Sequence, residues 1–421
     1  MNAKASYLRR VSVRASLVAV LALLLVGPAA GRTSTAAVGI ESGPSHGRYV
    51  TTTVDRFVSH VSTVPANAGE AVQLFVREVR LTKPDPQPDH GQDEDHATRE
   101  KHQFMRHVVV MAGGGTQPAM ASFNLEYGDY NWMEYLANAG FDVFSLDFTG
   151  YGLSPRPRMD DPCNTVASEQ RLLLIPNPLA ALCTPKYQFK LTSRESDDAE
   201  LDSVVDFIRN LRDVATVDLV GWSRGGSRIA RYAASHPEKV GRLVLYAPGY
   251  NRAEATLRTT PEPGIPMTVR TVSSFFAGWN AQAKCADEID PGIRAPLAAL
   301  IMSFDPLGQT WGSEPLWRAP NQSLTGWNQP VAAQVKAPTL IIGGELDTTV
   351  LPAERRSLYD DLTMSDKVLV SVACAAHQLV WERQHTVLDS ASLEWLTEGT
   401  FAGQTAGVFR VDTDGVATPA P

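Results

Sequence analysis

The sequence predicts an α/β protein whose core is a mostly parallel, eight-stranded sheet flanked by helices, with an inserted lid. Three observations carry this prediction. Two β-rich stretches near the start indicate an antiparallel hairpin, strand and helix patterns then alternate, and one strand passes through a glycine-flanked serine directly into a helix. With 421 residues, the chain can bury a large core. In such sheets, sites form at the carboxyl ends of the strands.

Local patterns justify each element in turn. The β-rich stretches 48–61 and 69–81 are separated by a short segment with proline and glycine, which is typical of a hairpin. Apolar runs bounded by turn residues predict further strands at 107–112, 141–147, 217–222, 240–247, 338–343 and 368–372. Apolar residues at helical spacing predict helices at 132–139, 197–214, 227–234 and 386–395.

Two segments interrupt the alternation and divide the chain into parts. Residues 48–247 are expected to form the first part of the core, with a proline-rich insertion at 155–191. Residues 248–335 are expected to form a lid above the strand ends, and 336–400 complete the core. The tail, 401–421, is expected to contain a short extended segment and a disordered end.

The first 30 residues have the order of a signal peptide. An apolar run at 15–26 follows basic residues and precedes small residues, with cleavage expected after Ala30. The alternative is an uncleaved membrane anchor, for which the run is short. We therefore expect a secreted, periplasmic or cell-envelope protein with no stable membrane span after cleavage. The basic residues are Lys4, Arg9, Arg10 and Arg14.

The four cysteines fit an exported protein. An even number of cysteines in an exported chain suggests disulfides. Cys163 and Cys183 bracket one insertion and are the expected pair, which leaves Cys285 with Cys374 by elimination. The alternative is four buried free thiols.

Charge and composition exclude several classes of partner. With a net charge of −8, the chain offers no reason to expect nucleic acid or an anionic membrane. His90, His96 and His102 lie in or beside the polar run 83–101, whose composition indicates a solvated loop rather than a metal site. We expect no metal and no cofactor.

The most informative stretch is a strand that ends in Gly221, Trp222 and Ser223. A serine on a sharp turn between a strand and a helix is a nucleophile elbow, in the pattern Gly-x-Ser-x-Gly. Gly221 and Gly225 are expected where a side chain would collide with the neighbouring backbone. Ser223 is therefore the candidate nucleophile.

A serine nucleophile needs a base, and the base needs a carboxylate that orients it. His377 follows the strand at 368–372 directly and is the expected base, whereas His385 is expected on a helix surface. Asp347, which follows the strand at 338–343, is the expected acid. Glu345 is the alternative, and either carboxylate could instead cap the next helix.

An oxyanion hole needs backbone N–H groups aimed at the developing negative charge. One is expected from Arg224, the residue after the nucleophile. The second is expected from the glycine loop after the strand at 107–112, with Gly115 favoured and Gly114 and Thr116 as alternatives. The other interpretation of this loop is a tight turn without a ligand.

Together these pieces resemble the α/β-hydrolase fold family. The resemblance covers most of residues 105–395 in the family's order and rests on the glycine loop, the turn at 147–154, the elbow, residues 343–352 and His377. It implies acyl transfer through Ser223, because members that open epoxides or displace halide use aspartate at the elbow. The lid matches no subfamily, so the resemblance leaves the substrate open.

Six aromatic residues of the lid allow two interpretations. They could form a wall that binds an apolar or aromatic acyl group, or they could form the lid's own small core. Trp222 and Tyr151 are expected to pack beneath or beside the site. The six are Phe275, Phe276, Trp279, Trp311, Trp317 and Trp327.

The leading hypothesis is therefore an exported serine hydrolase that cleaves a fairly apolar, small-molecule or lipid-like carboxylic ester. The same residues could serve a carbon–carbon hydrolase, an acyltransferase or a peptidase that removes N-terminal residues. A peptidase needs an acidic group for the substrate amine, and Asp287, Glu288 and Asp290 are candidates. The remaining alternative is a binding protein of the same fold without catalysis.

Overall fold

The computed structural model describes residues 33–35, 49–82, 107–254, 260–323 and 326–421. All of these described residues belong to one compact unit. The predicted signal peptide and the three histidines between residues 90 and 102 lie outside the described residues. Over the part of the chain that is described, no helix is long and apolar enough to cross a membrane.

A single sheet of eleven strands organises the molecule, in the order β1-β2-β3-β5-β4-β6-β7-β10-β11-β12-β13. The hairpin β2–β3 is antiparallel, and β3 also pairs with β5 in antiparallel orientation. From β5 to β12 in this spatial order, all neighbouring strands run parallel. The eight predicted strands are all present. They are β2 (Val50–Val61), β3 (Ala71–Thr82), β4 (Val108–Ala112), β5 (Asp142–Leu146), β6 (Val217–Trp222), β7 (Val240–Tyr246), β10 (Thr339–Gly344) and β11 (Lys367–Val372).

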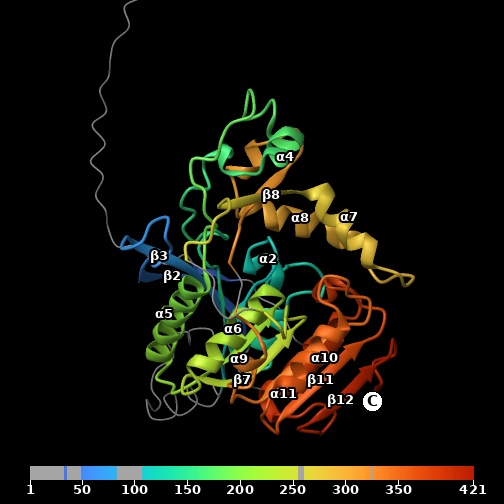
Figure 1. Cartoon of the computed structure of the whole chain (residues 1–421). Coiled ribbons are helices and arrows are strands. Elements are labelled where there is room, and N and C mark those ends of the chain that lie inside the picture. Colours follow the sequence, from blue (N-terminus) through green and yellow to red (C-terminus); the bar gives the residue numbers. More distant parts are fainter. Residues whose placement is uncertain (1–32, 36–48, 83–106, 255–259, 324–325) are drawn as a thin grey trace, which may run out of the picture. The chain divides into compact units, whose positions relative to one another are not determined.

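Helices cover both faces of this sheet, because consecutive strand residues point to opposite sides. On β6, Leu219 packs with α5 (Arg194–Arg212), α6 (Arg224–Ser235) and α10 (Pro352–Asp361). The next residue, Val220, belongs to the core on the other face, with α3 (Trp132–Asn138) and α11 (His385–Glu398). Figure 1 shows α5, α6 and α10 along the sheet. Of these helices, α6 begins directly after the carboxyl end of β6.

The C-terminal tail differs from its prediction. Instead of a disordered end, β12 (Gly407–Val411) pairs in parallel with β11, and β13 (Ala417–Pro419) closes the edge in antiparallel pairing. Phe409 and Val411 are buried, and Phe409 contacts Phe401 edge to face. These apolar contacts explain why the segment is ordered. At the opposite edge, β1 (Thr33–Thr35) pairs with β2.

The two inserted segments have little regular structure. Residues 155–191 contain η1 (Pro162–Asn164), α4 (Ala167–Glu169) and η2 (Gln170–Leu174). Residues 248–335 contain a two-stranded sheet, β8 (Met267–Thr271) and β9 (Leu316–Pro320), and the helices α7 (Val272–Gln282), α8 (Arg294–Ser303) and α9 (Gln329–Ala332). They also contain η3 (Pro291–Ile293) and η4 (Gly308–Thr310).

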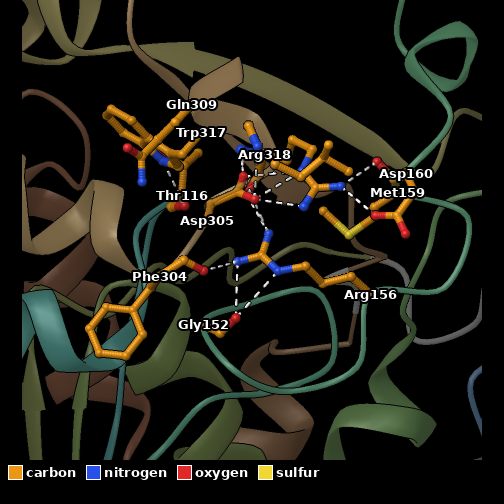
Figure 2. Close-up of polar contacts among 12 residues, drawn as sticks. Thr116, Gly152, Arg156, Met159, Asp160, Phe304, Asp305, Gln309, Trp317 and Arg318 are labelled. Atoms are coloured by element: carbon orange, nitrogen blue, oxygen red, sulfur yellow. Dashed lines mark hydrogen bonds and ion pairs between the residues drawn. The ribbon is translucent and has the colours of Figure 1, made fainter. Parts of the chain in front are cut away.

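Buried charges join the two segments to each other and to the core (Figure 2). The Arg318 guanidinium donates to both carboxylate oxygens of Asp305, with Nη2 2.6 Å from Oδ1. Arg156 of the first segment donates to the carbonyl oxygens of Gly152 and Phe304 and lies 3.6 Å from Asp305. Because Arg318 and Asp305 are almost fully buried, loss of either one would remove the main partner of the other and leave Arg318 with Asp160, or Asp305 with Arg156.

The aromatic residues of 248–335 are mainly structural. Trp279, Trp311, Trp317 and Trp327 are buried within the cores, whereas Phe275 and Phe276 are only half-buried. Trp279, Trp317 and Trp327 pack in the two main cores beside the large sheet. The interpretation as the segment's own core therefore holds only for Trp311, which packs in a small core with residues of β8. Of the six, Phe275 and Trp327 each border a cavity at Ser223.

Both predicted disulfides are present, Cys163–Cys183 and Cys285–Cys374, with Cα–Cα distances of 5.4 and 5.6 Å. The second one joins the segment after α7 to the loop after β11. Disulfides persist in oxidising compartments, so this pair of bonds is typical of a protein that functions outside the cytoplasm.

Candidate active site

Ser223 lies at the sharp turn between β6 and α6. Its φ of 54° is strained for a residue with a side chain, and its N–H donates to the Tyr246 carbonyl over 2.8 Å. A side chain on Gly225 would overlap the Ala112 carbonyl, and one on Gly221 would come within 2.7 Å of the Gly225 backbone. The two flanking glycines therefore let this turn form, as the sequence predicts.

Three side chains from distant parts of the chain form one hydrogen-bonded row. The Ser223 hydroxyl lies 3.0 Å from His377 Nε2, and His377 Nδ1 lies 2.9 Å from Asp347 Oδ2. All three residues are at most 6% exposed. Ser223 follows β6, Asp347 follows β10 and His377 follows β11, so the carboxyl ends of three parallel strands bring them together.

Asp347 is surrounded by hydrogen-bond donors. Its Oδ1 accepts from the N–H groups of Thr349 and Val350, each over 2.8 Å, and its Oδ2 accepts from Arg355 Nη1 over 3.2 Å. Arg355 is fully buried and also donates to the Val350 and Gly344 carbonyls. Sequence reasoning missed Arg355, because an arginine eight residues after an aspartate in a helical pattern carries no signal of burial.

The loop that carries His377 is fixed at its backbone. The His377 carbonyl accepts from Trp222 Nε1 over 3.1 Å and from the Tyr246 hydroxyl over 2.6 Å. Glu382 accepts from the Ala376 N–H over 2.7 Å and from Trp279 Nε1 over 2.8 Å. Burial raises the pKa of Glu382 to about 8. These contacts hold the imidazole in place through its own chain segment.

The two alternative residues lie elsewhere. Glu345 forms an exposed ion pair with Arg410 of β12, 2.7 Å apart. The prediction that His385 lies on a helix surface is wrong: it is buried at the start of α11. Its ring stacks on Tyr130, and its Nδ1 lies 2.8 Å from the Glu382 carbonyl, which explains its burial.

The glycine loop lies against the elbow. A side chain on Gly114 would overlap the Trp222 carbonyl, so this position requires glycine. The Gly115 carbonyl accepts from the Tyr151 hydroxyl over 2.9 Å, and the Thr116 carbonyl accepts from Trp317 Nε1 over 3.0 Å. The Thr116 N–H is engaged by the Gln117 side chain over 3.1 Å. Trp317 belongs to β9, so the segment 248–335 supports this loop directly.

Two cavities meet at Ser223. The first, of about 260 Å³, lies between the glycine loop, His377 and α7, and is lined in part by Gly115, Arg224 and Phe275. The second, of about 300 Å³, lies on the other side of Arg224 and is lined in part by Tyr250, Trp327, Glu254 and Glu354. A substrate could therefore extend to both sides of the serine hydroxyl. Both cavities have polar groups among their lining residues.

The order of the strands, the elbow and the hydrogen-bonded Ser–His–Asp row together define a known class of protein. The sequence profile of the alpha/beta hydrolase fold family matches residues 107–384. This match spans more than half of the chain, which belongs to the α/β-hydrolase fold family. The predicted fold class and the resemblance to this family are thereby confirmed. Comparison with curated proteins finds no match.

Solved structures with a similar fold include three enzymes. A meta-cleavage product hydrolase from Pseudomonas fluorescens is 14% identical, with 81% of this chain and 98% of that chain covered and a TM-score of 0.44. A monoacylglycerol lipase from Paleococcus ferrophilus is 20% identical (70% and 95% covered, TM-score 0.41). An enol-lactonase from Burkholderia xenovorans is 15% identical (78% and 97% covered, TM-score 0.46). Likeness at this level carries no information about the substrate.

Proposed function

We propose that this protein is an exported serine hydrolase that cleaves a carboxylic ester through Ser223, His377 and Asp347. The observation that carries the proposal is the continuous row of hydrogen bonds from the Ser223 hydroxyl to the Asp347 carboxylate. Ser223, at one end of this row, borders two cavities that can hold the two halves of an ester. A buried serine hydroxyl aligned with an oriented imidazole is the arrangement that activates a nucleophile.

The proposed reaction proceeds in two halves. Ser223 Oγ attacks the ester carbonyl carbon while its proton moves to His377 Nε2, and the carbonyl oxygen becomes an oxyanion. The C–O bond to the alcohol then breaks, and His377 gives the proton to the leaving oxygen. Water next attacks the acyl-enzyme, again through His377, and the acid leaves as Ser223 regains its proton. Asp347 stays ionised and stabilises the imidazolium.

Backbone N–H groups of Arg224 and Gly115 are the proposed oxyanion hole. Both residues line the cavity that contains Ser223 and His377. Gly114 does not line this cavity, and the Thr116 N–H already has the Gln117 side chain as its acceptor. Gly115 is therefore preferred over both alternatives from the glycine loop, since an oxyanion donor must be free to bind the substrate oxygen.

The peptidase alternative loses the acids that suggested it. Glu288 is buried and accepts from the N–H groups of Lys284 and Cys285, while Asp290 accepts from the Tyr127 hydroxyl. Neither these two nor Asp287 borders a cavity at Ser223. The two glutamates that do so, Glu254 and Glu354, each accept from a backbone N–H. An ester is therefore the preferred substrate.

Export is the second part of the proposal. The two disulfides favour an oxidising compartment, and the first 30 residues have the composition of a cleaved signal peptide. Mass spectrometry of the protein recovered from the medium or cell envelope should find a mature chain that begins at Gly31. A chain that retains its first residues would contradict cleavage.

Active-site labelling tests the catalytic proposal. A fluorophosphonate probe should label the wild-type protein at Ser223, and para-nitrophenyl esters should be hydrolysed. Ser223→Ala should abolish the labelling and lower kcat by about 10⁴-fold or more, since the acyl-enzyme can no longer form. Ser235→Ala, at the exposed end of α6 and bordering neither cavity, is the matched control and should be labelled normally. A folded wild-type protein that takes no label would refute the proposal.

A further inference from the structure

The cavity between the glycine loop and α7 is lined by positively charged side chains. Two arginines line it: Arg224 follows the nucleophile, and Arg270 projects from β8. No acidic residue is among the lining residues described for this cavity. The hydroxyl of Ser274 and the side-chain amides of Gln282 and Gln378 add polar groups. An apolar acyl chain would desolvate these groups without compensation.

No polar contact within the described part of the chain explains the position of either arginine side chain. Within the described part of the chain, the side chains of Arg224 and Arg270 form no ion pair and donate no hydrogen bond. Burial raises the pKa of Glu169, and the charge of Arg270 opposes this effect, yet the two side chains form no ion pair. Glu169 instead accepts a hydrogen bond from Thr268. Other arginines of the inserted segments, such as Arg318 and Arg156, are held by carboxylates and carbonyls.

A third group in the cavity also lacks a partner. The side-chain carbonyl oxygen of Gln378, the residue after His377, is buried and accepts no hydrogen bond from a described residue. Buried acceptors in folded proteins are nearly always satisfied. A ligand that offers a carboxylate to the guanidinium groups would give both arginines a partner.

We infer that this cavity binds a carboxylate of the substrate, so that the enzyme acts on esters that carry a negative charge in one half of the molecule. The inference rests on the proposed function and replaces the expectation of an apolar ester. A guanidinium group matches the two oxygens of a carboxylate and can form paired, charge-assisted hydrogen bonds with them. Arg270 is the proposed specificity residue, because it is remote from the reacting atoms in sequence and lies in β8 rather than at the elbow.

Matched esters test the inference. The para-nitrophenyl hemiester of adipic acid is compared with the ester in which an isopropyl group replaces the free carboxylate. A second pair places the carboxylate or the isopropyl group on the phenol of a butyrate ester, which tests the other half of the substrate. In at least one pair, the charged ester should have the higher kcat/KM. The preference should shrink as salt is raised, since Arg270 is exposed before binding.

Arg270→Gln should reduce that preference by about 10- to 100-fold, mainly through a higher KM for the charged ester. Arg171→Gln changes an exposed arginine of the neighbouring segment that borders neither cavity and should alter nothing. Calorimetry on Ser223→Ala protein adds a readout without turnover. It should bind adipate, and the additional Arg270→Gln change should weaken that binding.

The possible failures are distinguishable. If the wild-type enzyme hydrolyses the uncharged ester of both pairs as well as or better than the charged one, the carboxylate site is refuted and the serine hydrolase stands. If the probe labels nothing and no ester is cleaved, the proposed function fails. In that case, adipate binding that depends on Arg270 would still support the site, and its absence would refute the site too.

Discussion

At the scale of single residues, Arg355 links the candidate acid to its surroundings. Burial lowers the pKa of its guanidinium, and the charge of Asp347 opposes this effect. The arginine is retained because it satisfies the Asp347 carboxylate and two backbone carbonyls at once. We infer that Arg355 is a positioning residue, which acts on the reaction through Asp347.

Arg355→Gln tests this role through the pH dependence of kcat/KM. Removing a positive charge near His377 favours its imidazolium form, so the acid limb of the profile should move to higher pH. The rate at the optimum should also fall, by about 10-fold, as Asp347 loses its fixed orientation. Arg356→Gln, which removes an exposed pair with Asp360 and an exposed hydrogen bond to the Pro421 carbonyl, is the control. An unchanged acid limb with lower stability would show a purely structural role.

Some residues of the candidate site could be predicted from the sequence, and others could not. Ser223, His377 and Asp347 could be predicted, since each follows a buried strand and the parallel sheet brings strand ends together. Arg355 and Glu382 could not, because their burial depends on contacts with distant segments. Nor could the sequence alone show that Arg270 and Arg224 share one cavity.

At the scale of elements, the same distinction holds for the fold. Strands of the core are predictable because apolar runs and turn residues mark them locally. In the tail, a short extended segment could be predicted, whereas the order of its end could not, since that order depends on pairing with β11 and on the burial of Phe409 and Val411. The structure of the inserted segments could not be predicted from local patterns either. Their order depends on disulfides, buried ion pairs and apolar contacts between segments that are distant in the sequence.

The contact between β9 and the glycine loop yields a prediction at this scale. Trp317→Phe keeps an aromatic ring but removes the N–H that donates to the Thr116 carbonyl. The loop should then sample other positions, so kcat for an uncharged ester should fall by about 10-fold with little change in KM. Trp311→Phe, in the small core that contains β8, is the matched control. Equal losses in both variants, or a loss confined to KM, would argue against support of the oxyanion loop.

At the scale of the whole molecule, several buried carboxyl groups should set how stability depends on pH. Burial raises the pKa of Glu382 to about 8 and that of Glu200 to about 7. It raises the pKa of three further carboxyl groups to about 6, those of Asp147, Asp198 and Asp218. In the unfolded chain such groups ionise near pH 4. From about pH 4 upward, the folded protein therefore holds more protons than the unfolded one.

Because the folded state binds the extra protons, its stability should fall as pH rises from about 5 to about 8. The decrease should be steepest between the pKa values of these groups in the unfolded chain and those in the folded protein. Urea unfolding with the disulfides intact, measured at several pH values in this range, tests the sign. Glu382→Gln should flatten the slope, since the amide cannot lose a proton, and Glu394→Gln at a partly exposed site should leave it unchanged. A free energy of unfolding that rises over this range would show that these carboxyl groups are ionised in the folded protein.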